Sequence, residues 1–87
     1  MISDETLRRL DDLSDRCDPP PWVASVEGRD HESGDDMIMT GVGTDRGEDI
    51  YVSRDGGPAS PDYLDLIAAA RTYLPILVAE VRADRDK

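Results

Sequence analysis

The densest group of side chains that could do chemistry lies on one stretch, residues 27–36. It reads EGRDHESGDD and combines carboxylates, a guanidinium, an imidazole, a hydroxyl and two glycines. A glycine-bounded loop can turn its backbone N–H groups toward an anion, and Arg29 offers a two-pronged contact to a phosphate or carboxylate. The stretch therefore predicts a loop that binds a small anionic or nucleotide-like ligand, with the candidate ligand-binding residues Glu27, Arg29, Asp30, His31, Ser33 and Asp35.

Three other interpretations use the same loop. A metal site would take Asp30, His31 and Asp35, with Glu27 as a further ligand, but the chain has no second histidine and no calcium-loop pattern, so we predict no metal. A hydrolytic site would use His31 as its base, but no nucleophile can be identified, so we predict neither an enzyme nor a cofactor. The remaining alternative is a solvated hairpin loop whose charges pair locally.

Two aromatic residues and two further arginines complete the predicted binding site. Trp22 and Tyr51 supply flat faces for a ring, and Arg54 and Arg71 are candidate cations. The alternative for Arg71 is a side chain that pairs with an acid or extends along its helix to water. The alternative for Arg54 is a solvated turn. Because the formal charge of the chain is −10, an anionic ligand would need cations from more than one subunit.

The elements that must position these residues can be predicted from the local pattern. A first helix begins at Ser3, which can cap it, and ends before Pro19, because the residue preceding a proline avoids the α region. Alternation of apolar residues predicts three short strands, at residues 22–26, 37–40 and 49–53. Glycine and proline predict a turn at residues 54–58.

A long helix is predicted at the end of the chain. Ser60-Pro61-Asp62 is typical of a helix start, and no glycine follows it. Pro75 lies inside the helical pattern and predicts a kink, or a division near Thr72. The apolar positions from Tyr63 to Val81 form a surface wider than one sheet can cover. We therefore expect a homo-oligomer, a dimer or higher, with a second copy covering the other side.

The order of elements predicts an α+β fold. Short connections favour a three-stranded antiparallel meander, with both helices packed on one face. The length of 87 residues is that of one small domain, residues 1–87. We also expect Trp22 to be largely buried against the last helix, because the three prolines before it determine where it enters.

Several short motifs resemble those of small proteins from phages, prophages and bacteria, which read roughly PGPW, EGRD, SGD and FIAxARxxxPxLLxEV. The matching segments here are Pro20–Trp22, 27–30, 33–35 and 67–81. The chain departs from the pattern at Pro20, which replaces a glycine, and at Leu66, which replaces a phenylalanine. Some small oligomeric phage proteins sequester nucleotide immune signals, and this analogy implies a sponge of that kind.

Composition limits the partners. The chain has 20 acidic against 10 basic residues, which argues against direct nucleic-acid binding and against anionic membranes. Residues 71–87 are the least acidic part, with four basic and three acidic side chains. No signal peptide is recognised, so we expect a cytoplasmic location. The prediction is a non-catalytic homo-oligomer that binds a small ligand. The alternative is an acidic interaction protein that mimics nucleic acid toward, or inhibits, a basic protein partner.

Overall fold

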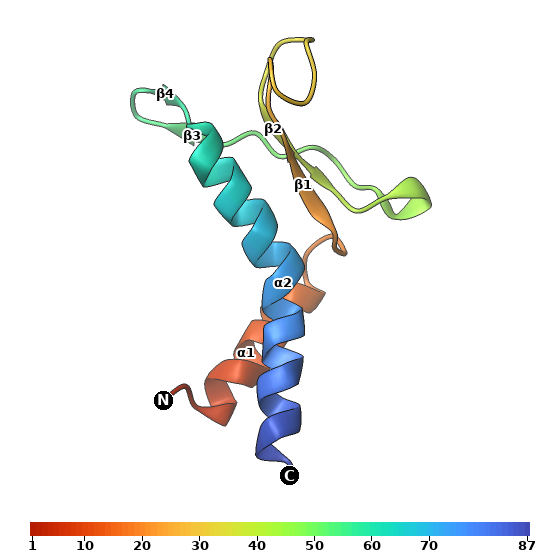
Figure 1. Cartoon of the computed structure of the whole chain (residues 1–87), viewed down its shortest axis with the longest axis vertical. Helices are drawn as coiled ribbons and strands as arrows, with labels where there is room; N and C mark the ends of the chain where they lie inside the picture. Colours follow the sequence, from red (N-terminus) through yellow and green to blue (C-terminus); the bar gives the residue numbers. More distant parts are fainter.

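One long helix organises the chain. Figure 1 shows the computed structural model, which describes all of residues 1–87, with the C-terminal helix running along the molecule. A β-hairpin lies beside the upper half of this helix, and the N-terminal helix lies beside its lower half. The fold is α+β, as predicted. The elements are α1 (Asp4–Asp15), β1 (Trp22–Ser25), β2 (Met37–Thr40), the 3-10 turn η1 (Gly43–Asp45), β3 (Ser53–Arg54), β4 (Gly57–Pro58) and α2 (Pro61–Arg85).

Helix α1 begins where the sequence predicts. The Ser3 hydroxyl accepts a hydrogen bond from the Thr6 N–H at 3.1 Å, which satisfies one of the free donors of the first turn. Leu7 is buried. Together with Ile2 and Leu10 it lines an apolar notch against α2, whose other residues are Leu74, Leu77, Val78 and Val81. The first helix is thus held to the last one by apolar side chains.

The predicted three-stranded meander is wrong. β1 and β2 pair antiparallel, with Trp22 opposite Thr40 and Ser25 opposite Met37. The predicted third strand contributes only one bridge, in which Ile38 and Ile50 exchange hydrogen bonds of 2.8 and 2.9 Å. Residues 53–54 pair instead with residues 57–58 in a second, two-stranded sheet. A tight turn at residues 55–56 joins the two strands of this local hairpin. The backbone of residues 53–54 therefore pairs within the hairpin and not with β2.

The core lies between the β1–β2 hairpin and the first half of α2. Ile38 and Leu64 are its most enclosed large side chains, with 0% and 1% of their surface exposed. Three alanines complete the buried cluster, Ala24, Ala59 and Ala68. Trp22, Ile50, Val52 and Ile67 pack around this cluster and are partly buried. The alanines allow the hairpin to approach the helix closely, but they supply little apolar area.

Helix α2 is continuous over 25 residues, and Pro75 lies inside it. The helix is therefore not divided near Thr72, and Figure 1 shows its axis changing direction about halfway along. Pro61 occupies the first turn, as predicted, but the Ser60 side chain makes no capping hydrogen bond. Neither helix has the length and apolar character needed to cross a membrane.

We expect Leu64→Ala to lower the free energy of unfolding by about 2–5 kcal/mol, because it removes buried methyl groups and leaves a cavity. Chemical denaturation followed by circular dichroism measures this loss. Leu13→Ala is the matched control, because Leu13 is 42% exposed, and it should cost less than about 1 kcal/mol. Equal losses in the two variants would contradict the position of the core.

Candidate functional site

The predicted binding loop forms most of its backbone hydrogen bonds within itself. The Val26 carbonyl accepts hydrogen bonds from the N–H groups of Arg29 at 3.1 Å and Asp30 at 2.7 Å. The Asp30 carboxylate in turn accepts from the Val26 N–H at 2.9 Å. Gly28 has a φ of 82°, and its N–H donates to the His31 carbonyl at 2.7 Å. These N–H groups therefore bond within the loop instead of facing outward as an anion-binding cradle would need.

Arg29 ties this loop to α2. Its two terminal nitrogens donate to the two oxygens of Asp65, each at 2.9 Å, and its Nε donates to Asp30 at 2.9 Å. The local pairing with Asp30 was one of the alternatives that the sequence left open, whereas Asp65 was not foreseen. Asp65 lies on an otherwise apolar stretch of the helix, and an isolated acid there is the signal that could have indicated a partner for a loop arginine.

The ion pairs of Arg29 shift its own pKa and the pKa values of Asp30 and Asp65. The hydrogen bonds from Arg29 lower the pKa of Asp65. The backbone N–H of Val26, followed by Arg29, lowers the pKa of Asp30. Asp65 first, and then Asp30, raise the pKa of Arg29. All three groups stay charged near neutral pH, and the guanidinium fork is already occupied by carboxylates.

Both ring nitrogens of His31 are also occupied. Nε2 lies 2.9 Å from the Asp35 carbonyl, which can only accept, so Nε2 carries the proton. Nδ1 then accepts from the Ser25 hydroxyl at 2.9 Å. Ser25 is only 8% exposed, so this serine–histidine pair does not present its hydroxyl to a substrate. The pair fastens the loop to the end of β1.

Trp22 and Arg71 lie next to each other where the end of α1, the connector before β1, and α2 come together. The Arg71 guanidinium donates to the carbonyl oxygens of Ser14 and Asp18, each at 3.0 Å, and lies 5.8 Å from the centre of the Trp22 ring. The Trp22 indole N–H donates to the same Asp18 carbonyl at 3.1 Å. The main-chain N–H of Trp22 donates to the Thr72 hydroxyl at 3.0 Å. Arg71 therefore caps the end of α1 by binding carbonyls, and it does not pair with an acid.

The burial of Trp22 differs from the prediction. Its side chain does contact α2 through Arg71, but it is half-buried instead of largely buried. The connector at residues 18–21 brings the ring to the edge of the core, because its indole N–H must reach the Asp18 carbonyl. Polar contacts thus set the position of this ring as much as apolar packing does.

The other predicted site residues are dispersed. Tyr51 is 58% exposed and shares a shallow hollow of about 280 Å³ with Asp35. Arg54 donates to the Tyr63 hydroxyl at 2.9 Å and lies over its ring, at the start of α2. The main-chain N–H of Glu27 donates to Asp36 at 2.8 Å, while its own carboxylate and Ser33 are exposed. The ten predicted residues therefore do not form one pocket.

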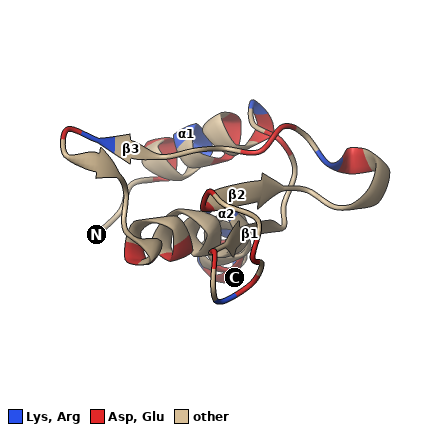
Figure 2. Ribbon diagram, turned by 90° about the horizontal axis from the view of Figure 1, so that it is seen from above, with Lys and Arg blue, Asp and Glu red and all other residues tan.

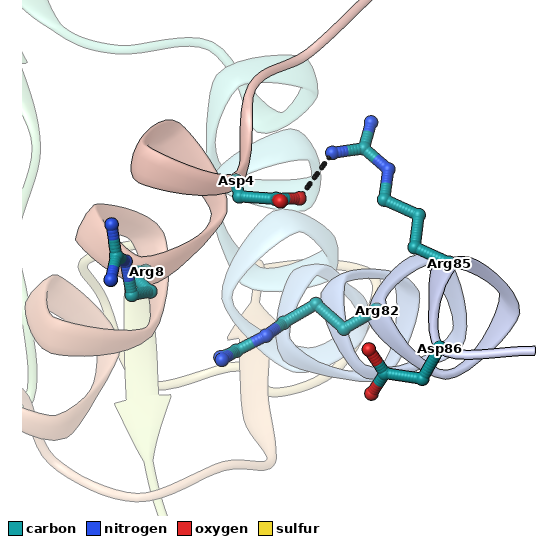
Figure 3. A pocket seen from close by; sticks show the side chains of 5 residues that line it. All are labelled: Asp4, Arg8, Arg82, Arg85 and Asp86. Atoms are coloured by element: carbon teal, nitrogen blue, oxygen red, sulfur yellow. Dashed lines mark hydrogen bonds and ion pairs between the residues drawn. The ribbon is translucent and has the colours of Figure 1, made fainter.

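A different set of cations comes together at the other end of the molecule. A hollow of about 350 Å³ lies where the start of α1 meets the end of α2, and it is lined by Asp4, Arg8, Arg82, Arg85 and Asp86. Figure 3 shows Arg85 reaching across from α2 to Asp4, at 2.7 Å. Arg82 pairs with Asp11 beside the hollow. Arg8 has no hydrogen-bond or ion-pair partner.

Sequence reasoning missed this hollow, although one signal pointed to it. Residues 71–87 are the least acidic part of the chain, and two of their arginines line the hollow. The last turn of a helix carries a partial negative charge, which favours cations there. The contribution of Arg8 could not be foreseen, because it depends on how α1 lies against α2.

Comparison of the chain with protein-family models, with curated proteins and with solved structures found no match. The resemblance of segments 20–22, 27–30, 33–35 and 67–81 to small phage, prophage and bacterial proteins therefore stays a prediction. The contacts described above give a structural role to several residues of those motifs, namely Trp22, Arg29, Asp30 and Arg71. No three histidine, cysteine or acidic side chains are grouped as metal ligands would be.

We expect acid to weaken the attachment of the loop to α2. Asp65 has a pKa below its ordinary value of 3.8 in the folded protein. Its stabilising effect is therefore fully present above 3.8 and is lost as the pH falls through the lower, folded value. Denaturation curves at a series of pH values measure the slope of stability, which should be shallower in Asp65→Asn than in the wild type.

Glu32→Gln is the matched control for this experiment, because Glu32 is an exposed acid on the same loop as Arg29 and forms no ion pair. It should keep the wild-type dependence on pH. If Asp65→Asn also kept it, the pair between Arg29 and Asp65 would not contribute to stability in solution.

Proposed function

We propose that the protein is a non-catalytic, homo-oligomeric protein that binds a small anionic ligand. The observation that carries the proposal is that three arginines, Arg8, Arg82 and Arg85, line one hollow of a chain whose formal charge is −10. Planar guanidinium groups match phosphates and carboxylates in geometry and charge. Arg8 lacks a partner within the chain, so it is the group most available to an incoming anion.

The lining of the hollow defines the class of ligand. It contains no apolar residue, so recognition depends on charge and not on stacking of a ring. Trp22 and Tyr51, the aromatic residues predicted to stack on a ligand, do not line it. The proposal therefore specifies a phosphate- or carboxylate-bearing group. Sequestration of a nucleotide immune signal is the form of this proposal that the analogy with small oligomeric phage proteins implies.

Catalysis is not part of the proposal. The hollow has no hydroxyl, thiol or imidazole in its lining, and the imidazole of His31 is held between Ser25 and the Asp35 carbonyl. A binding protein of this kind needs only charge and shape. Its effect would come from holding the ligand away from other receptors.

We expect Arg8→Ala to weaken the binding of inorganic pyrophosphate by about tenfold or more, because a charge-assisted hydrogen bond of about 1.5–3 kcal/mol is lost. Isothermal titration calorimetry at about 0.15 M ionic strength measures the affinity. Arg9→Ala is the matched control, because it removes the same charge from the next residue, which does not line the hollow.

Arg9→Ala should change the affinity less than about twofold, since an exposed charge at a distance is screened by salt. Equal effects of the two substitutions would show that only net charge matters. Absence of pyrophosphate binding to the wild-type protein would refute this ligand class.

A second candidate function is an acidic interaction protein that covers a basic partner. Figure 2 shows Asp and Glu distributed over both helices and the loops, with Lys and Arg between them. The hairpin loop carries three exposed acids without ion-pair partners, Glu27, Glu32 and Asp35. Carboxylates spaced along a loop can imitate the phosphates of a nucleic acid.

Binding to an arginine-rich peptide tests this second function. Replacement of Glu27, Glu32 and Asp35 by Gln, Gln and Asn should abolish most of the binding and flatten its dependence on salt. The control replaces three exposed acids of α1, Glu5, Asp12 and Asp15, by their amides. If both triple variants lose binding equally, the attraction is a property of the whole surface and not of the loop.

A further inference from the structure

One face of α2 is apolar and has no partner. From Leu66 to Ala79 the helix carries a single charged side chain, Arg71, and that side chain is turned to the Ser14 and Asp18 carbonyls. On the outer face, 68% of Leu66, 60% of Tyr73 and 55% of Leu77 are exposed. In a chain with 34% charged residues, an uncharged face of this length needs an explanation.

The isolated chain is also less compact than its length allows. Its radius of gyration is 15.2 Å, against about 12 Å for a compact domain of this length. Its accessible surface is 6374 Å², whereas a monomer of its mass should expose about 5,100 Å². The excess exceeds the roughly 800 Å² that each partner buries in a standard interface. A second chain could therefore cover it.

The exposed side chains of α2 follow the spacing of a coiled-coil seam. Steps of three and four residues alternate along the outer face, at Tyr63, Leu66, Ala70, Tyr73, Leu77 and Glu80. Side chains spaced in this way lie on one line of a helix and interlock with a second helix. The seam is roughly 26 Å long at 1.5 Å per residue. Leu77 lies where this line borders the α1 contact, since it also lines the apolar notch against α1.

We propose that this seam is the interface of an antiparallel homodimer, in which α2 packs against α2 of a second copy. A twofold axis level with residues 71–72 makes the seam self-complementary. It places Leu66 against the partner's Leu77, and Ala70 against the partner's Tyr73. Each small side chain then faces a large one, which is how helices interlock at distances of about 8–10 Å. The inference rests on the proposed function, which calls for a homo-oligomer, but the anion-binding hollow itself lies within one chain.

The charged residues at the two ends of the seam, Arg54 and Glu80, favour the antiparallel orientation of the two helices. Arg54 has no carboxylate partner in its own chain, since it donates to the Tyr63 hydroxyl and lies 4.8 Å from the centre of that ring. Glu80 forms no ion pair. The antiparallel arrangement places the partner's Glu80 at Tyr63 and Arg54, on both sides of the axis. A parallel arrangement would oppose Glu80 to its own copy and leave a gap between two Ala70 side chains.

The mass of the protein in solution tests the dimer. Light scattering on the wild-type protein at micromolar concentration should give twice the chain mass of 9.6 kDa. Leu66→Asp and Tyr73→Asp should each give the mass of one chain with unchanged helix content, because both side chains are exposed in the single chain. Val42→Asp is the control, because Val42 is 58% exposed but lies outside the seam, and it should leave the mass at two chains. A wild-type protein with the mass of one chain overturns the proposal.

Crosslinking tests the direction of the helices. In a Cys17→Ser background, Leu66→Cys and Leu77→Cys are prepared as separate chains and treated with a short bismaleimide. The antiparallel dimer predicts that each variant alone crosslinks poorly and that their mixture crosslinks efficiently. Efficient crosslinking of Leu66→Cys to itself indicates a parallel pair and overturns the proposal.

Charge reversal tests the ends of the seam. Arg54→Glu and Glu80→Arg should each weaken dimerisation by about 2- to 5-fold for each ion pair, and the double variant should restore it. Failure of the double variant to restore dimerisation overturns the placement of Glu80 beside the partner's Arg54. Pyrophosphate titration of Leu66→Asp then separates this inference from the proposed function, since anion binding by a single chain would survive loss of the dimer.

Discussion

Both α1 and the β1–β2 hairpin pack against helix α2, and these contacts are decisive because the chain buries little apolar surface. Only eight apolar residues are buried, and three of them are alanines. A core of this size provides little of the free energy that must offset the loss of chain entropy. The hairpin and α1 do not form a common core of their own, so each depends on a different stretch of the same helix.

Polar contacts also attach the other segments to α2, in addition to the small apolar core. Arg29 joins the hairpin loop to Asp65, and the Trp22 main chain joins β1 to Thr72. Arg71 joins the end of α1 to the middle of α2. Directional contacts of this kind add modest stability at an exposed surface, but they determine which segments meet and at what angle. This structural role explains the motif residues Arg29, Asp30 and Arg71 without any ligand.

This structural use of the charged residues changes where a ligand is to be sought. A guanidinium that already holds two carboxylates is poorly placed to bind a third anion, so the loop cations are weaker candidates than their chemistry suggests. At the junction of α1 and α2, Arg82 and Arg85 are paired with Asp11 and Asp4. Arg8 differs from them because it has no partner, and the nearby end of α2 favours positive charge. The proposed dimer seam follows the exposed side of the same helix and borders the α1 contact at Leu77, so one helix would serve the fold, the ligand and the partner.

The sequence by itself determined the local elements. Each of these local signals acts within a few residues. They are the Ser3 cap, the proline that ends the first helix, the apolar alternation at 22–25 and 37–40, and the glycine-free stretch after Pro61. They predicted both helices and the β1–β2 hairpin. The prediction of a third strand beside β2 was wrong, because residues 53–54 pair with residues 57–58 in a local hairpin. Only Ile50 bridges to β2. The pairing of Arg29 with Asp65, the contact of Arg71 with two carbonyls and the gathering of Arg8, Arg82 and Arg85 were decided only by the tertiary structure. These contacts join residues 36 to 77 positions apart, and such distances are set by how the helices pack, which no local pattern encodes.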